Sequence, residues 1–210
     1  MFQDREEAGR LLAEKLSKCK NDKDTIVLGI PRGGIVVAYY VAKELNVKMD
    51  VLVVRKIGFP GNEEFAIGAA SQDSFFVNEE VSRELSEEFL SEQIKAKQDE
   101  AMEKTKLLRG TKPIHDLKGK NVIIVDDGIA TGATISMAIS IIRKSGPKKI
   151  IAAIPVAPPE SVKELEKIAD EVVCLLTPKY FAAVGQFYRD FRQVSDEEAV
   201  RFLADNSKDF

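Results

Sequence analysis

Short apolar runs alternate with amphipathic segments along most of this 210-residue chain. The runs predict strands over residues 25–30, 50–54, 65–69, 74–77, 122–125, 150–156 and 171–176. Between them, apolar residues recur at helical spacing, which predicts helices over residues 4–19, 35–45, 79–108, 134–144 and 161–169. Because strands alternate with helices, the pattern predicts an α/β fold with a mostly parallel central sheet flanked by helices.

Polar residues mark the ends of several predicted helices. Asp4 and Asn78 stand where a side chain can cap a helix start, and Gly110 stands where a helix can stop. The helix that begins after Asn78 is longer than a sheet connection needs, so it could support a hood or a dimer contact. Its charges of mixed sign indicate a face in contact with water.

Composition narrows the class of protein. The length suits one domain over residues 1–210, and the net charge of −3 argues against a broad nucleic-acid-binding face. Cys19 and Cys174 follow no metal or redox spacing, which indicates reduced thiols in a cytoplasmic protein. The charged amino-terminal segment does not resemble a signal peptide, and no apolar run has the roughly 20 residues that cross a bilayer, so we expect no membrane partner.

The candidate chemistry lies directly after the apolar run 122–125. Asp126 and Asp127 follow this predicted strand, and a loop containing Gly128 and Gly132 then opens a predicted helix. In open parallel sheets, ligands bind at the carboxyl ends of strands. Glycines let backbone N–H groups approach an anion, and the start of a helix favours negative charge, so the loop predicts a phosphate site.

The two aspartates need a different partner, because a carboxylate repels a phosphate. A ribose diol beside the phosphate would suit them, and so would Mg²⁺ that is held mainly by the ligand. Residues 122–134 thus favour a phosphorylated sugar as the ligand.

These thirteen residues, Val-Ile-Ile-Val-Asp-Asp-Gly-Ile-Ala-Thr-Gly-Ala-Thr, resemble the signature of type I phosphoribosyltransferases for phosphoribosyl pyrophosphate (PRPP). In that family, the paired acids bind the ribose hydroxyls and the following loop wraps the 5′-phosphate. The resemblance implies that Asp126 and Asp127 hold the sugar, and hold Mg²⁺ directly or through ribose hydroxyls or water. It assigns the 5′-phosphate to Gly128, Ile129, Ala130, Thr131, Gly132, Ala133 and Thr134.

Three further positions are similar to the same family. Pro31, Arg32, Gly33 and Gly34 resemble its pyrophosphate loop, although the same residues would also suit an ordinary turn. Arg55 and Lys56 resemble a basic pair near the pyrophosphate, and residues 57–64 resemble a flexible lid. The similarity runs from residue 25 to residue 176 in the order that the family requires.

The resemblance implies a type I phosphoribosyltransferase fold, commonly dimeric, with a small hood from residues 1–20, residues 177–210 or both. The implied reaction moves phosphoribose from PRPP to a nitrogen acceptor and releases pyrophosphate. Arg55, Lys56, Asp126 and Asp127 are the implied catalytic residues, and Mg²⁺ is the implied cofactor.

The acceptor stays open between a purine, a pyrimidine and another amine or amide. Val184-Gly185 faintly resembles hypoxanthine-type members, but Asp190 stands at a different spacing from the acid that follows there. The aromatic residues of segment 180–191 would either stack on a base or pack the tail against the sheet. His115 lies in a polar stretch, and we assign it no catalytic role.

Two alternatives to this enzyme remain. A non-enzymatic PRPP-sensing regulator shares the fold but needs a surface for nucleic acid, usually basic, which the net charge does not favour. A diphosphotransferase or phosphatase-like enzyme would need a P-loop or a nucleophile at the strand end. The chain has no Gly-x-x-x-x-Gly-Lys-Ser/Thr motif, and Asp126 is the one candidate nucleophile.

Overall fold

A parallel sheet forms the centre of the molecule. The computed structural model describes residues 1–110 and 115–206, with the side chains of residues 63 and 64 left aside. Within this part of the chain, five parallel strands lie in the order β2-β1-β6-β7-β8. Their bounds are β1 (Thr25–Gly29), β2 (Lys48–Val51), β6 (Asn121–Val125), β7 (Lys149–Val156) and β8 (Glu171–Leu176). The predicted mostly parallel sheet is confirmed.

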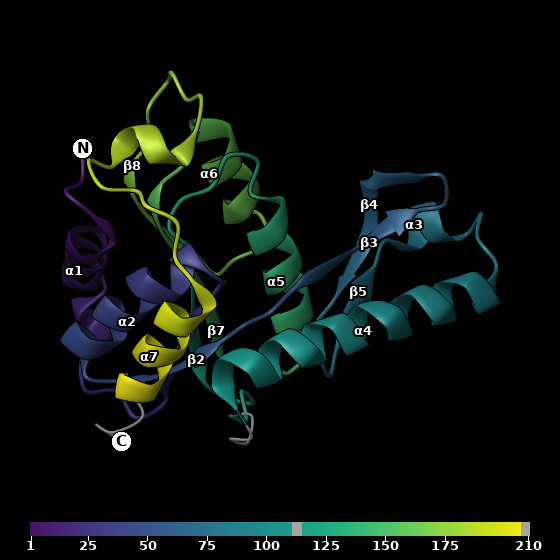
Figure 1. The fold of residues 1–210 in the computed structure, drawn as a ribbon, viewed down its shortest axis with the longest axis horizontal. Helices are drawn as coiled ribbons and strands as arrows, with labels where there is room; N and C mark the ends of the chain where they lie inside the picture. The colour runs from purple at the N-terminus through teal and green to yellow at the C-terminus, as the bar shows by residue number, and fades with distance from the viewer. Residues whose placement is uncertain (111–114, 207–210) are drawn as a thin grey trace.

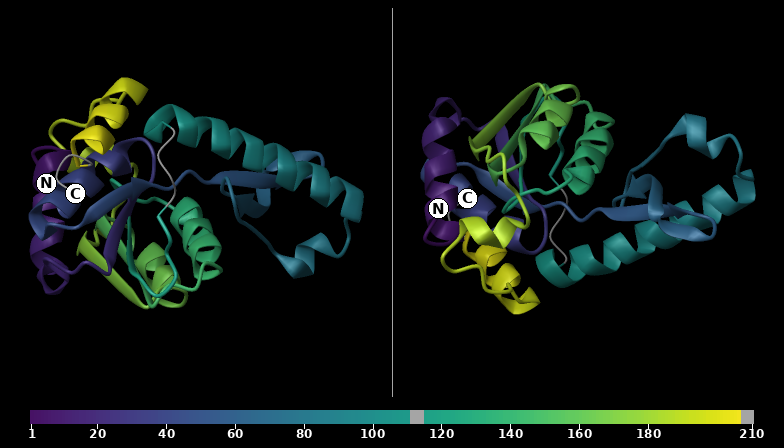
Figure 2. Two further views of the ribbon diagram at one scale, coloured as in Figure 1. Left: turned by 90° about the horizontal axis from the view of Figure 1, so that it is seen from below. Right: turned by 90° about the horizontal axis from the view of Figure 1, so that it is seen from above.

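Helices cover both faces of this sheet (Figures 1 and 2). Helices α1 (Arg5–Lys15) and α2 (Gly33–Leu45) cover one face, and α5 (Ala133–Arg143) and α6 (Pro159–Glu166) cover the other. Val27 of β1 pairs in register with Ile123 of β6, and both pack toward α1 and α2. Their neighbours Leu28 and Ile124 pack toward α5. Both faces of the strands are buried, which explains why they read as continuous apolar runs.

An arm extends from one side of this body (Figure 1). It contains the antiparallel strands β3 (Arg55–Phe59), β4 (Asn62–Ala70) and β5 (Phe75–Val77), followed by the helices α3 (Glu79–Ser82) and α4 (Glu87–Arg109). The arm has its own small core around Ile57, Ile67 and Ala70. Near the end of α4, Arg109 forms an ion pair of 2.8 Å with Asp50 of the edge strand β2, which fastens the arm to the body.

The carboxyl-terminal part of the chain returns to the body. It contains the 3-10 turn η2 (Val184–Phe187) and helix α7 (Asp196–Asn206), which packs against α2 and α4. The backbone of Phe2 pairs with this tail: its N–H donates to the oxygen of Phe187 at 2.7 Å, and its oxygen accepts from the N–H of Arg189 at 2.9 Å. The amino-terminal segment therefore lies against residues 187–189 of the tail, whereas α7 ends beside β2, where Asn206 accepts a hydrogen bond of 2.9 Å from the N–H of Met49.

Several predicted boundaries need correction. The predicted helix 79–108 is broken, because Ser86 accepts a hydrogen bond from the N–H of Phe89 (3.2 Å) and starts α4 as a new helix. The predicted strand 50–54 ends at Val51, so its last residues lead into the arm. The predicted helix 4–19 stops at Lys15 and is followed by the 3-10 turn η1 (Ser17–Cys19). Helix α7 was not predicted.

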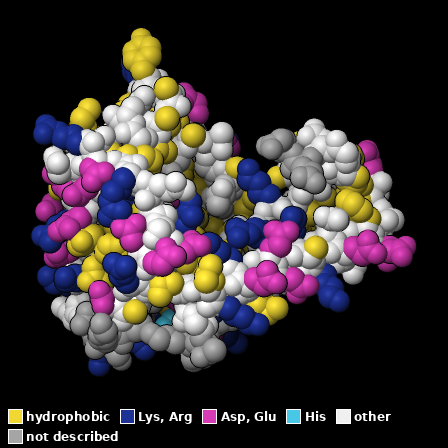
Figure 3. Space-filling view, viewed as in Figure 1, with side chains coloured by type: hydrophobic (Ala, Val, Ile, Leu, Met, Phe, Trp, Pro, Cys, Tyr) yellow, Lys and Arg dark blue, Asp and Glu magenta, His cyan; other side chains and the backbone are white. Residues whose placement is uncertain are grey.

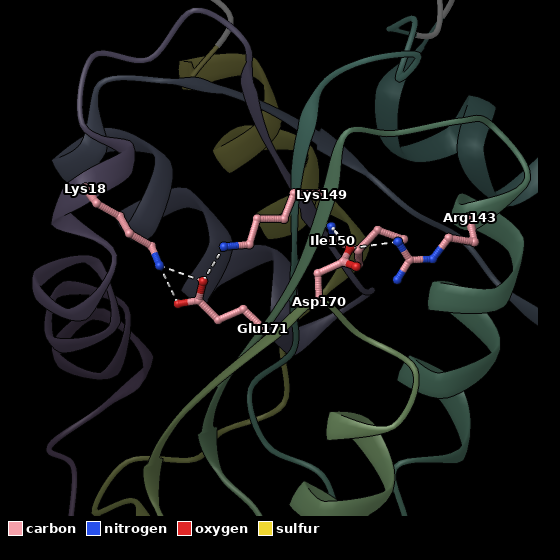
Figure 4. A network of polar contacts seen from close by, with 6 residues as sticks. All are labelled: Lys18, Arg143, Lys149, Ile150, Asp170 and Glu171. Atoms are coloured by element: carbon pink, nitrogen blue, oxygen red, sulfur yellow. Dashed lines mark hydrogen bonds and ion pairs between the residues drawn. The ribbon is translucent and has the colours of Figure 1, made fainter.

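Ion pairs secure the amino ends of β7 and β8, as Figure 4 shows. The carboxylate of Glu171 accepts hydrogen bonds from Lys18 (2.6 Å) and Lys149 (2.7 Å). Asp170 accepts hydrogen bonds from Arg143 and from the N–H of Ile150, both at 2.7 Å. These pairs lie at the edge of the sheet opposite to the carboxyl ends of its strands. Among the described residues, no helix has the length and apolar character needed to cross a membrane.

Candidate functional site

The two predicted acids lie at the carboxyl end of the central strand. Strand β6 ends at Val125, whose oxygen accepts a hydrogen bond of 2.9 Å from the N–H of Ile30 after the neighbouring strand β1. Asp126 and Asp127 come next, and both are half-buried. The sheet topology thus brings the ends of β1 and β6 together, as the sequence predicts.

The first turn of α2 lies against these acids. A methyl group built on Gly33 would come within 1.8 Å of Oδ2 of Asp127, and one built on Gly34 would come within 2.8 Å of the oxygen of Val125. The glycines therefore permit a close approach between α2 and the acids. The sequence predicted residues 31–34 as a loop, but α2 begins at Gly33, so both glycines are helical.

Asp127 has a cationic partner that the sequence did not reveal. Nε and one terminal nitrogen of Arg5 both donate to Oδ2 of Asp127 at 2.8 Å. The side chains are 9% and 15% exposed, so this ion pair is largely shielded from water. The hydroxyl of Tyr188 also donates to the backbone oxygen of Asp127 at 2.5 Å. Arg5 and Tyr188 lie far from the motif in sequence, and no local pattern connects them with it.

Burial changes the acidity of both aspartates. Burial and then the negative charge of Asp127 raise the pKa of Asp126 well above its usual range. Burial also raises the pKa of Asp127, while the charge and hydrogen bonds of Arg5 oppose this rise. A cation or a hydrogen-bond donor at this place would favour the ionised forms.

The loop after the acids leads directly into α5. Gly132 has a φ of 75°, in the left-handed region that favours glycine, and the helix starts at the next residue. Ile129 is anchored in the core, and the oxygen of Ala130 accepts a hydrogen bond of 2.7 Å from Ser161 at the start of α6. Ala130 and Thr131 are exposed. The loop thus presents its exposed turn at the amino end of α5.

Gly128 has a packing role that the sequence did not reveal. A methyl group built there would come within 2.4 Å of Val184 and 3.0 Å of Val156. Its lack of a side chain thus makes room for the carboxyl-terminal tail, and its predicted contact with the 5′-phosphate stays a prediction.

Basic residues gather where the arm joins the body (Figure 3). Asp196 at the start of α7 pairs with Lys104 of α4 at 2.7 Å and lies 3.8 Å from Arg32. Lys104 and Arg55 line a shared cavity of about 310 Å³ together with two acidic residues, Glu100 and Glu103, and Arg55 lies 3.8 Å from Glu100. The structure therefore links two predicted pyrophosphate residues, Arg32 and Arg55, through a lysine that the sequence analysis did not single out. Lys56 is exposed on β3.

Residues 57–64 do not form a simple loop. They form most of the hairpin between β3 and β4, with its turn at Pro60 and Gly61. Arg55 and Lys56 begin β3 in the arm, four residues after β2 ends, and not at the carboxyl end of β2 itself. Whether this hairpin closes over a ligand stays a prediction.

The tail aromatics mainly pack the tail against the body. Phe181, Phe187, Tyr188 and Phe191 belong to a cluster with Phe2 and Val156. Tyr180 is the exception, because it is 92% exposed.

Two other predictions concern single residues. His115 lines a cavity of about 300 Å³ whose described lining includes none of residues 126–134. Burial raises the pKa of Cys174 to about 11, which suits a structural thiol.

Comparisons with known proteins agree with this arrangement. The sequence profile of the phosphoribosyl transferase domain matches residues 3–192. A Mycobacterium tuberculosis protein named as a phosphoribosyl transferase is 43% identical over 221 aligned positions, which cover 100% of this chain and 48% of that protein. The chain thus spans about half the length of this relative.

Two further comparisons concern a solved structure and a shorter match. The crystal structure of TT1426 from Thermus thermophilus is 40% identical, covers 98% of both chains and has a TM-score of 0.89. A ribose-phosphate pyrophosphokinase of Pyrococcus furiosus is 44% identical over 59 residues, 27% of this chain and 21% of that enzyme. Because the profile covers most of the sequence, the chain belongs to the phosphoribosyl transferase domain family.

Proposed function

We propose that this protein transfers phosphoribose from PRPP to a nitrogen acceptor and releases pyrophosphate. The observation that carries the proposal is the end of β6, where two half-buried aspartates are followed by a glycine-containing turn and the start of α5. Family membership supports the same donor. The acceptor would be a nucleobase or a related amine.

The turn from Gly128 to Thr134 would bind the 5′-phosphate. Its backbone bends at Gly132, and the first N–H groups of α5 follow at Ala133 and Thr134. Such N–H groups stabilise an anion because helix hydrogen bonds do not use them. The exposed position of Thr131 leaves its hydroxyl near the same place.

The aspartates would bind the ribose hydroxyls on the other side of the phosphate. They are acceptors when ionised, and a diol offers two donors. As the bond to pyrophosphate breaks, positive charge develops on the sugar, and two nearby carboxylates stabilise that charge. Burial raises the pKa of both aspartates, so a ligand that donates hydrogen bonds to them would favour their ionised forms.

The residues at the site fit Mg²⁺ that is bound chiefly by its ligand. Among the described residues, no group of three or more His, Cys, Asp or Glu side chains could hold a metal ion. Mg²⁺ commonly takes one or two protein carboxylates and completes its shell with waters and phosphate oxygens. Asp126 and Asp127 supply that number, directly or through water, and bound Mg²⁺ would neutralise charge on pyrophosphate.

The leaving pyrophosphate would face the basic residues near the arm. Arg32, Arg55 and Lys104 are connected through Asp196 and the shared cavity, and Lys56 lies next to Arg55. Gly33 and Gly34 add backbone N–H groups at the start of α2. Closure of the β3–β4 hairpin would exclude water, which otherwise hydrolyses the donor.

Calorimetry with Mg–PRPP tests the first step of this proposal. We expect the wild type to bind, and we expect Asp126→Asn and Asp127→Asn each to weaken binding about ten- to hundredfold, since each loses charge-assisted hydrogen bonds. Gly132→Val should abolish binding, because a β-branched residue rarely adopts a φ of 75° and would therefore distort the phosphate turn. Asp99→Asn, an exposed residue of α4, is the matched control and should bind normally. A wild type that does not bind Mg–PRPP would end the proposal.

A second assay separates an enzyme from a PRPP-sensing regulator. Pyrophosphate release would be followed across a panel of nucleobases and simple amines, and RNA binding would be measured with and without PRPP. Turnover with any acceptor supports the enzyme. RNA binding that responds to PRPP, without turnover, would support the regulator. The expected homodimer and cytoplasmic location stay predictions.

A further inference from the structure

Arg5 lies against the site although it belongs to the first turn of α1. Each nitrogen of its guanidinium group has a partner: Nε and one terminal nitrogen bind Oδ2 of Asp127, and the other terminal nitrogen donates to the oxygen of Arg192 at 2.9 Å. Its plane also lies 4.0 Å from the centre of the Phe191 ring. The motif itself does not include this residue.

These contacts restrict how Asp127 can move. Two donors converge on one oxygen, so a rotation of the carboxylate would break both hydrogen bonds. The backbone of α2 at Gly33 also leaves no room beside this ion pair, since a methyl group there would lie 1.8 Å from the same oxygen and 2.9 Å from Nε of Arg5. Oδ2 is therefore held between α1 and α2, and Oδ1 takes no part in the ion pair.

The same contacts connect Asp127 with the carboxyl-terminal tail. Tyr188 donates to the backbone oxygen of Asp127, and Arg5 links the carboxylate to Arg192 and Phe191. The charged and titratable groups that the structure places against Asp127 are Asp126 beside it, Arg5 from α1 and Tyr188 from the tail. Residues 188–192 thus contact the backbone of Asp127 directly, through Tyr188, and its carboxylate indirectly, through Arg5.

We propose that Arg5 is a positioning residue, which orients the carboxylate of Asp127 toward the ribose diol and couples that orientation to residues 188–192. This inference rests on the proposed function. Arg5 would act on the sugar through Asp127, because each nitrogen of its guanidinium group is already hydrogen-bonded to Asp127 or to Arg192. The effect of Arg5 should therefore depend on whether the ligand carries the hydroxyl that Asp127 binds.

The test compares two ligands that differ by one hydroxyl. Binding of ribose 5-phosphate and 2-deoxyribose 5-phosphate would be measured by calorimetry for the wild type, Arg5→Gln, Arg5→Lys and Arg10→Gln. Arg10 is an exposed arginine on the same helix that pairs with Glu6, so its replacement removes the same charge away from Asp127. Thermal unfolding of each variant would be recorded beside the binding data.

We expect the wild type and Arg10→Gln to prefer ribose 5-phosphate. Arg5→Gln should weaken binding of ribose 5-phosphate about tenfold, because Asp127 loses the charge-assisted hydrogen bonds that orient it, and leave 2-deoxyribose 5-phosphate nearly unchanged. Arg5→Lys should recover part of the preference, because lysine keeps the charge but cannot bridge Asp127 and Arg192 in the same way. If Arg5→Gln does not fold, Arg5→Lys alone gives the comparison, with an intermediate preference expected.

The outcomes separate this inference from the proposed function. A wild type without preference for the diol contradicts the sugar-binding role of the acids, and so the proposed function. A wild type with that preference, together with Arg5 variants that retain it in full, overturns only the role of Arg5. Equal weakening of both ligands by the Arg5 variants also overturns it, since that result indicates a general loss of structure.

Discussion

At the level of single residues, Asp126 and Asp127 show how neighbours distinguish two identical side chains. Asp127 has Arg5 at hydrogen-bond distance, whereas Oδ1 of Asp126 accepts from the backbone N–H of Asp127 at 2.9 Å. Both acids and the following turn could be predicted, because the strand, the acids and the glycines are adjacent in sequence. Arg5 could not be predicted, because 122 positions separate it from its partner.

The glycine at position 33 gives a prediction at this scale. Alanine favours a helix over glycine by about 1 kcal/mol, so Gly33→Ala would stabilise α2 if space allowed. The methyl group would instead lie 1.8 Å from Asp127 and 2.9 Å from Nε of Arg5. We expect a net loss of about 1–3 kcal/mol in the free energy of unfolding, together with weaker Mg–PRPP binding.

Urea unfolding and calorimetry would measure these two effects. Glu44→Ala, at an exposed position of the same helix, is the control and should change neither by much. A Gly33→Ala protein that is more stable than the wild type and binds equally well would show that α2 does not press against Asp127.

At the level of elements, local patterns predicted most strands and helices but not all of their ends. Strands β1, β6, β7 and β8 appear within one residue of their predicted bounds, because their apolar runs are buried on both faces. The break between α3 and α4 was missed, since the apolar stripe of residues 79–108 continues across Ser86. Helix α7 was also missed, although its start signal is present in the sequence.

That signal is a capping box at the start of α7. The N–H of Glu198 donates to the hydroxyl of Ser195 at 3.2 Å, and Glu198 in return accepts from the N–H of Ser195 at 3.0 Å. Replacing Ser195 by alanine removes the first of these bonds, so we expect Ser195→Ala to lower the free energy of unfolding by about 1 kcal/mol.

Urea unfolding of Ser195→Ala and Ser195→Asp would check this expectation. Aspartate can also cap a helix, so Ser195→Asp should keep most of the stability. Equal losses in both variants would mean that the hydroxyl of Ser195 contributes something other than the cap.

At the level of the whole molecule, the arm and the body are joined by a buried ion pair. Asp50 of β2 and Arg109 of α4 are 7% and 10% exposed, and Arg109 also donates to Gln72 at 3.3 Å. Within the part of the chain that the structure describes, Nε of Arg109 is buried and has no hydrogen-bond partner. Burial therefore removes much of the hydration of the two side chains, and the hydrogen bonds that they form replace only part of it. The sequence could not predict this pair, since it joins residues 59 positions apart.

Removing one residue of the Asp50–Arg109 ion pair should lower the free energy of unfolding more than removing both. Arg109→Met leaves the carboxylate of Asp50 buried without its cation, which costs about 3–5 kcal/mol. The double variant Asp50→Leu/Arg109→Met removes both charges and should regain most of that loss. Denaturant unfolding of the two single variants and the double variant gives the coupling energy directly. A double variant as unstable as Arg109→Met would contradict this account.

The contacts of Asp127 also have a consequence for the order in which parts of this protein fold during synthesis. The carboxylate needs Arg5 from the start of the chain, and its backbone oxygen needs Tyr188 from near the end. A nascent chain on the ribosome can complete the β6 turn early, yet it cannot hold that turn in its final form until Tyr188 has emerged. We therefore expect the turn to reach its final geometry only after residue 188 has emerged, because such long-range contacts form slowly.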